Sequence, residues 1–228
     1  MSSAININLD IKGLIFDLDG VIADTAHLHY KAWCQIASQW KFDLSVDQNE
    51  KLKGVSRKNA MQKIAKWAGK SFSEKELEDF AEQKNTLYLY YCESLSHKDA
   101  LPGVVSFIDE CRRTGLKLAV GSASKNAKII LQKLQIIDLF QIVVDGNMVE
   151  KSKPHPEVFL KAAQFLKINP SDCVVFEDSQ AGIQAALNAG MKNIGIGSSD
   201  LLNCNAHIQS FEKYNLKKLS TQINNQNS

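Results

Sequence analysis

The sequence predicts an α/β fold, in which a parallel sheet carries helices on both faces and an all-helical domain is inserted after the first strand. Strand-like apolar runs alternate with helical patterns along most of the chain. The apolar runs are continuous, which is typical of parallel strands buried on both faces. The stretch 27–100, by contrast, contains helical patterns and no convincing strand.

Five apolar runs are predicted as strands, namely 13–19, 116–124, 141–145, 173–178 and 192–197. Four helical patterns lie between these runs, at 104–114, 126–134, 156–166 and 180–189. Gly115 and Gly190 directly follow two of these patterns, as expected for helix ends. A series of strand–helix units implies an open parallel sheet with right-handed crossovers.

The insert is predicted to form three helices, near 27–40, 56–68 and 73–95. It leaves the sheet near Thr25 and returns before Leu101. We therefore expect a catalytic core of residues 1–26 and 101–228 and a helical cap of residues 27–100. The terminal segment TQINNQNS, residues 221–228, is expected to be a frayed polar tail.

Composition narrows the class of protein. The chain has 228 residues, 23% charged residues and a net charge of +2, which argues against a dedicated nucleic-acid or membrane-surface protein. Its five cysteines are scattered and include no CxxC pair, so we expect reduced thiols in the cytoplasm. The N-terminal MSSAININLD lacks the pattern of a signal peptide. A monomer is the default expectation.

Polar side chains follow the predicted strands at their carboxyl ends, where parallel α/β sheets collect ligands. These residues are Asp17 and Asp19, Ser122 and Ser124, Glu177 and Asp178, and, after a short loop, Lys153. Taken singly, each has a structural explanation: a turn aspartate, a helix-capping serine or a solvated lysine. Four such clusters at one sheet edge instead predict a shared site.

A phosphoryl-transfer site would explain this cluster. Asp17, Glu177 and Asp178 together carry a formal charge of −3, which Mg²⁺ and Lys153 would bring to zero. An ionised Asp17 could attack phosphorus and form an aspartyl phosphate. Asp19 could protonate the leaving oxygen and later deprotonate an incoming hydroxyl. We expect neighbouring negative charge to raise the pKa of Asp19.

Four motifs resemble those of the haloacid dehalogenase-like phosphotransferases: FDLDGVIADT, GSAS, KSKPHP and FEDSQAG, in this order between residues 12 and 197. The resemblance implies a Rossmann-like core, with Asp17 as nucleophile and Asp19 as acid and base. It also implies that Mg²⁺ is held by Asp17, the carbonyl of Asp19 and Asp178, with Glu177 nearby. Ser122 would bind the transferring phosphoryl group and Lys153 would neutralise it.

The cap contains a basic segment. Residues 51–70 include seven Lys or Arg and no Asp or Glu. One interpretation is a solvated helix face, balanced by the acidic SEKELEDFAE that follows. The alternative is a second anion site, in which Arg57 grips a phosphate as a fork and Gly54 allows close backbone approach.

The motifs of the cap favour the second interpretation, because they resemble those of the β-phosphoglucomutase branch of the family. The similar segments are FDLDGVIADTAHLHYKAW, LKGVSR, QKN, LPG, SASKN, SKP and EDSQAGI. The resemblance implies a phosphorylated hexose substrate and a glucose 1,6-bisphosphate intermediate. Ala60 departs from the pattern, since a serine is common there.

The same resemblance implies a wider set of substrate-binding residues. On the cap they are His29, Trp33, Lys53, Gly54, Val55, Ser56, Arg57 and Lys84, and on the core Ser122, Ala123, Ser124, Lys125 and Asn126. His29 would contact Asp19 and couple cap closure to proton transfer, whereas His27 would face solvent. Two alternatives remain open: a sugar-phosphate phosphatase with the same core, and a non-catalytic phosphoacceptor module.

Overall fold

The computed structural model describes residues 10–197 and 200–224. The expectation of no signal peptide and the last residues of the predicted frayed tail lie outside this part. Within it, no helix is long and apolar enough to cross a membrane.

The core is a six-stranded parallel sheet in the order β3-β2-β1-β4-β5-β6. The strands are β1 (Gly13–Phe16), β2 (Lys117–Gly121), β3 (Ile142–Val144), β4 (Cys173–Glu177), β5 (Lys192–Ile196) and β6 (Ala206–Ile208). The five predicted strands are present, and β6 was not predicted. β1 pairs with both β2 and β4, so the strand order reverses beside β1, where ligands collect in such sheets.

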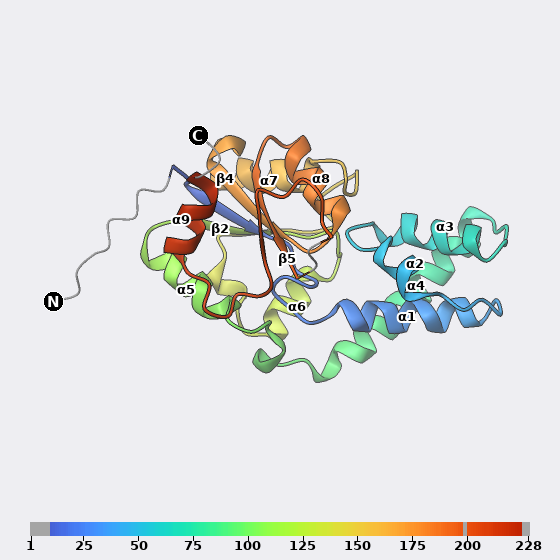
Figure 1. Cartoon of the computed structure of the whole chain (residues 1–228). Coiled ribbons are helices and arrows are strands. Elements are labelled where there is room, and N and C mark those ends of the chain that lie inside the picture. The colour runs from blue at the N-terminus through green and yellow to red at the C-terminus, as the bar shows by residue number, and fades with distance from the viewer. Residues whose placement is uncertain (1–9, 198–199, 225–228) are drawn as a thin grey trace.

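Helices cover both faces of the sheet, as predicted (Figure 1). Because side chains alternate along a strand, Leu14 and Phe16 of β1 face one layer and Ile15 faces the other. The first layer contains α5 (Val104–Arg113), α6 (Ala127–Lys133) and α9 (Leu216–Asn224), and the second contains α7 (Glu157–Leu166) and α8 (Gln180–Asn188).

Short 3₁₀ turns connect several of these elements: η1 (Cys92–Ser94), η2 (His97–Asp99), η3 (Ile137–Leu139) and η4 (Pro170–Asp172). The prediction of a frayed tail from residue 221 was wrong for its first residues, because α9 extends to Asn224. Ile223 is buried against the core together with Leu216 and Leu219. This apolar spacing anchors the last helix to the sheet.

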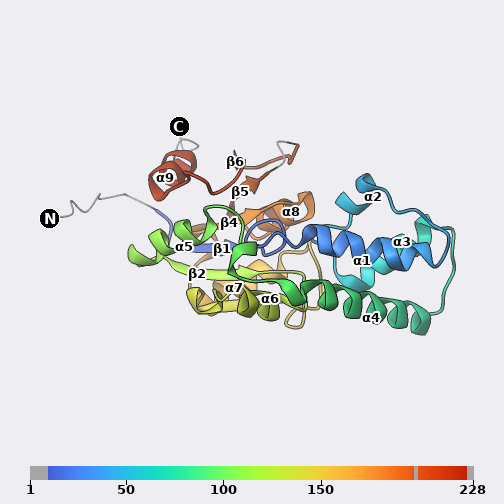
Figure 2. The same ribbon diagram turned by 90° about the horizontal axis from the view of Figure 1, so that it is seen from below.

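The insert folds into four helices, grouped beside the carboxyl ends of the strands (Figures 1 and 2). They are α1 (Ala26–Ser38), α2 (Val46–Glu50), α3 (Arg57–Trp67) and α4 (Glu74–Tyr91). Three match the predicted helices, whereas α2 is an additional short one. Serine N-caps begin α2, α3 and α4, and capping boxes complete the caps of α2 and α4.

The cap has its own apolar cluster, which includes Trp33, Ile36, Met61 and Ile64. The chain leaves and re-enters the core side by side, at an antiparallel bridge between Ala23 and Ala100. We propose residues 27–100 as a cap domain on this basis. Its position places the N-terminus of α3 opposite the strand ends.

Candidate active site

Three carboxylates meet at the centre of the sheet edge. Asp17 directly follows β1, while Glu177 ends β4 and Asp178 follows it. Ligand atoms of the three residues lie within 4.8 Å of one another. Lys153 joins this group, with its Nζ 2.6 Å from Asp17 Oδ1 and 2.8 Å from Glu177 Oε2, and it is only 2% exposed. Residues far apart in the chain therefore form one buried charge cluster.

The cluster carries more negative than positive charge. Burial raises the pKa of Asp17 well above its usual value, although Lys153 opposes the shift. Burial and the neighbouring Glu177 raise the pKa of Asp178 to about 7. Burial would lower the pKa of Lys153, but the two carboxylates outweigh it and raise that pKa. Hard carboxylate oxygens in this number and spacing suit Mg²⁺, which would relieve the repulsion.

Two glycines make room for these carboxylates. A Cβ atom at Gly182, in the first turn of α8, would lie 1.9 Å from Glu177 Cδ. At Gly20, where φ is +82°, a Cβ would lie 2.3 Å from Asp178 Oδ2. Ser179 caps α8 and also donates to Glu177 Oε1 at 2.6 Å. The residue types of the FEDSQAG and FDLDG motifs thus follow from close packing around the acids.

Asp19 has a different environment from Asp17. Its carboxylate accepts a hydrogen bond from Thr25 Oγ1 and lies 3.4 Å from His29 Nε2. The expectation of a raised pKa was wrong: burial would raise it, but His29, Thr25 and the more distant Lys84 lower the pKa of Asp19 below its usual value. The charge interaction with His29 and the hydrogen bond from Thr25 favour the ionised form of Asp19 and together outweigh the effect of burial on its pKa.

His29 belongs to a stacked group on the cap side. Its ring stacks on Tyr88 with centroids 3.9 Å apart, and its Nδ1 lies 2.6 Å from Lys84 Nζ. Lys84 Nζ also lies 4.5 Å from the centre of the Trp33 ring. Burial, with the nearby Arg57, lowers the pKa of Lys84 to about 7. Trp33 is both a core residue of the cap and a wall of the site, while His27 is exposed, as expected.

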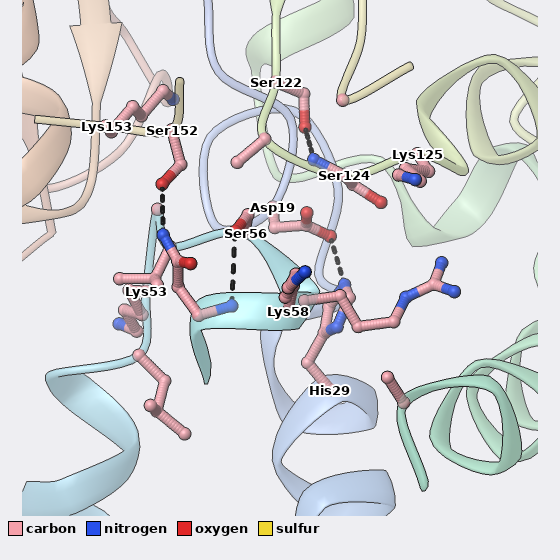
Figure 3. Close-up of a pocket in the computed structure, with 18 of the residues that line it drawn as sticks. Asp19, His29, Lys53, Ser56, Lys58, Ser122, Ser124, Lys125, Ser152 and Lys153 are labelled. Atoms are coloured by element: carbon pink, nitrogen blue, oxygen red, sulfur yellow. Dashed lines mark hydrogen bonds and ion pairs between the residues drawn. The ribbon is translucent and has the colours of Figure 1, made fainter. Parts of the chain in front are cut away.

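The loop after β2 forms the core wall of the site. Ser122 is 1% exposed and its Oγ accepts a hydrogen bond from the Ser124 backbone N–H at 3.1 Å (Figure 3). Ser124 Oγ in turn accepts from the Asn126 backbone N–H at 3.2 Å. Ala123 and Lys125 lie on the same wall. These bonds hold the loop in one shape beside Asp17.

The cap wall begins where α3 begins. Arg57 Nη1 lies 3.3 Å from Glu82 Oε2, and Ser56 caps the helix. At Gly54, where φ is +71°, a Cβ would lie 2.8 Å from Ser179 Oγ of the core, so the expected close approach is present. Lys53 Nζ lies 3.3 Å from Asp178 Oδ2, which brings it nearer the acid cluster than the resemblance implied.

The core wall and the cap wall line one cavity of about 860 Å³ (Figure 3). It is lined by every residue that the sequence analysis assigned to the site except Glu177, which belongs to the acid cluster but is fully buried and bonded to Lys153 and Ser179. Ala60 does not line it and packs in the apolar cluster of the cap. A methyl group suits that position because it is 1% exposed.

A sequence profile of the haloacid dehalogenase-like hydrolases matches residues 14–196, most of the chain. The chain belongs to this family. It is 39% identical over 189 residues to β-phosphoglucomutase of Bacillus subtilis (strain 168), covering 82% of this chain and 84% of that one. It is also 31% identical over 184 residues to the fructose-1-phosphate phosphatase YqaB of Escherichia coli (strain K12), covering 81% and 95% of the two chains.

The fold agrees with this membership. A crystal structure of β-phosphoglucomutase from Clostridium difficile superposes with a TM-score of 0.91 and 37% identity, covering 95% of this chain and 98% of that chain. The protein is an enzyme of the haloacid dehalogenase-like family. Mg²⁺ is the cofactor of its phosphotransferases, and Asp17, Glu177 and Asp178 are residues that can hold the ion.

Several polar residues of this family site were not predicted. Thr25 and Tyr88 contact Asp19 and His29, while Asn59, Glu82, Asn85 and Ser152 lie along the seam between cap and core. Thr25, Asn85 and Ser152 lie within quoted motifs, so their motif membership was the available signal. Tyr88, Asn59 and Glu82 occupy ordinary helix positions, where nothing local indicates a partner.

Proposed function

We propose that the enzyme is a β-phosphoglucomutase, which interconverts β-D-glucose 1-phosphate and glucose 6-phosphate through glucose 1,6-bisphosphate. One observation supports the proposal: a single cavity is lined by Ser122 and Lys153 beside Asp17 on the core and by Arg57 on the cap, so that it offers two groups of anion-binding side chains, here called poles. Ser122 and Lys153 form one pole beside Asp17, and Arg57 forms the other on the cap. A phosphosugar held at both ends fits this arrangement, and the similarity to the Bacillus subtilis enzyme supports the choice of sugar.

Asp17 is the proposed nucleophile. Lys153 engages its Oδ1, and its Oδ2 makes no hydrogen bond to any other described residue, which leaves that oxygen available. Oδ2 attacks phosphorus, and the bond from phosphorus to the sugar oxygen breaks. Asp19 gives a proton to the departing oxygen in one direction and takes one from the sugar hydroxyl in the other. His29 and Thr25 hold its carboxylate in place.

Mg²⁺ would be held by Asp17, Asp178 and the main-chain carbonyl of Asp19, with Glu177 nearby. When bound, the ion withdraws charge from the phosphoryl oxygens. Lys153 and Ser122 would bind the transferring group from the protein side. The raised pKa values of Asp17 and Asp178 support a cation at this position, because burial there disfavours the ionised acids.

The remaining residues are proposed to bind the sugar and its distal phosphate. Arg57 would grip the phosphate, assisted by the backbone and side chains of residues 53–56, with Lys84 near it. His29, Trp33 and the loop 122–126 would surround the sugar. After the first transfer the bisphosphate must turn round, so that its other phosphate faces Asp17. Two similar anion poles allow both orientations.

We further propose a monomeric enzyme in the cytoplasm. Both walls of the cavity come from one chain, so a single copy supplies the proposed residues. The five cysteines are free thiols, which suits a reducing compartment.

A sugar-phosphate phosphatase is the second candidate, favoured by the similarity to the fructose-1-phosphate phosphatase. It would use the same Asp17 and Asp19 but transfer the phosphoryl group to water. A non-catalytic phosphoacceptor has less support, because it has no use for Asp19 or for a second anion pole.

One assay separates the three. Enzyme and Mg²⁺ are mixed with β-glucose 1-phosphate, with and without glucose 1,6-bisphosphate, and glucose 6-phosphate and orthophosphate are both followed. A mutase forms mainly glucose 6-phosphate and is activated by the bisphosphate. Predominant orthophosphate release would refute the mutase proposal, and stable phosphorylation without turnover would indicate the acceptor module.

A further inference from the structure

Asn85 of the cap is hydrogen-bonded to Asn126, a core residue that lines the cavity. Its Oδ1 accepts a hydrogen bond of 2.8 Å from Asn126 Nδ2, in the loop that follows β2. Asn126 is only 7% exposed and Asn85 is half-buried, so water competes little for this bond. The sequence motif QKN contains Asn85, but the proposed function assigns a role only to its neighbour Lys84.

Asn85 is also linked, through Glu82, to Arg57 at the distal anion pole. Asn85 Nδ2 donates to Glu82 Oε1 at 3.3 Å, one turn earlier on α4. The other oxygen of Glu82, Oε2, lies 3.3 Å from Arg57 Nη1. A chain of polar contacts thus runs from Asn126 on the core through Asn85 and Glu82 to Arg57 on the cap.

A second bond crosses the seam elsewhere. Asn59 Nδ2 of α3 donates to Ser152 Oγ at 3.1 Å, and Figure 3 shows Ser152 beside Lys153 with this bond dashed. Asn59 is exposed, so water can replace its partner at little cost. Of these two amide hydrogen bonds, the one through Asn85 is the more shielded. The Lys53–Asp178 and His29–Asp19 contacts also join cap to core, but they involve the acidic groups of the site itself.

We propose that Asn85 is a positioning residue, which fixes the cap against the core and thereby favours phosphoryl transfer to a sugar hydroxyl over transfer to water. The inference rests on the proposed function, because it concerns the fate of the aspartyl phosphate. In the unwanted reaction a water oxygen bonds to phosphorus and the bond from phosphorus to the Asp17 oxygen breaks. Asp19 takes the proton of the water, orthophosphate leaves and the Asp17 carboxylate is regenerated.

The cap excludes water only while it is seated. Asn85 contacts neither the acid cluster nor Lys153, so its removal leaves the chemical groups in place. A loosened cap admits water to Asp17 and also misplaces the sugar hydroxyl that should attack. Both effects increase orthophosphate release relative to glucose 6-phosphate formation.

The test is Asn85→Ala, assayed with β-glucose 1-phosphate, glucose 1,6-bisphosphate and Mg²⁺. The ratio of orthophosphate release to glucose 6-phosphate formation should rise roughly three- to tenfold, as expected for the loss of one shielded hydrogen bond. In a Glu82→Gln background, which avoids two facing carboxylates, Asn85→Asp keeps the acceptor oxygen for Asn126 and its ratio should stay within roughly twofold of Glu82→Gln alone, whereas Asn85→Ala should raise it. Gln83→Ala, on the same helix with an exposed side chain, is the matched control.

A structural defect alone would lower the melting temperature or the total rate without changing the product ratio. In an Asn126→Ala background, the Asn85→Ala change should have no further effect on the ratio, since the bond is already absent. An unchanged ratio in Asn85→Ala, or equal ratios in the Ala and Asp variants of the Glu82→Gln background, would overturn the inference. If wild-type enzyme releases mainly orthophosphate, the proposed function fails instead, which the same assay shows directly.

Discussion

Replacing Lys153 with methionine would leave two buried carboxylates without their shared cation. Lys153 Nζ bonds both Asp17 and Glu177, at 2.6 and 2.8 Å. Removing one partner of a buried ion pair costs about 3–5 kcal/mol, because the remaining charge is uncompensated. In a protein of this size each kcal/mol changes Tm by about 2–4 °C, so Lys153→Met should melt roughly 6–20 °C lower at neutral pH.

The loss of Tm in Lys153→Met should depend on pH. Burial already raises the pKa of Asp17 and Lys153 opposes that shift, so the variant should have a still higher pKa in the folded state. A carboxyl group whose pKa is higher in the folded state than in the unfolded state, where it is about 3.9, does not destabilise the fold below that unfolded-state pKa. As pH rises through the folded-state pKa, ionisation of the group makes the fold progressively less stable. The Tm deficit should therefore be small near pH 4, grow toward pH 8, and shrink when Mg²⁺ is added.

The measurement is thermal unfolding of wild type and variant between pH 4 and 8, in chelator and in Mg²⁺. Lys12→Met is the matched control, because Lys12 pairs with Asp172 at a similar 2.7 Å but has a side chain that is 70% exposed. That variant should melt close to wild type at every pH. If Lys153→Met and Lys12→Met have equal Tm values at pH 8, the reasoning from buried charge is refuted.

Three further predictions concern the site. Asp17→Asn should reduce glucose 6-phosphate formation at least roughly a thousandfold and abolish phosphorylation of the enzyme, measured by intact mass; substantial turnover would exclude Asp17 as nucleophile. Arg57→Ala should raise KM for β-glucose 1-phosphate roughly tenfold or more, with Arg57→Lys intermediate; an unchanged KM would remove Arg57 from the distal pole. Lys84 has a pKa lowered to about 7, so the unfolded chain binds its proton more tightly and protonation costs stability. Lys84→Met should therefore gain most over wild type in Tm at pH 6 and less at pH 9, and the opposite trend would refute the lowered pKa.

Local patterns predicted the elements that bury a continuous apolar surface. The five predicted strands, β1 to β5, and the helices on both faces of the sheet follow from such runs. The edge strand β6 was missed because its residues 206–208 are partly or fully exposed and show no buried run. α2 was missed because it is five residues long and buries no side chain. Short, exposed elements depend on neighbours that a local pattern does not contain.

Sequence alone determined which chemical groups end the strands, because motif order and strand position are properties of the chain. It therefore indicated Asp17, Ser122, Lys153 and Asp178 as one set. Tertiary structure decided how each group is partnered: Thr25 and His29 lower the pKa of Asp19, against the expectation from nearby acids. The reason is physical, since a pKa or a bond across the seam depends on distances of a few ångströms between segments that only packing brings together.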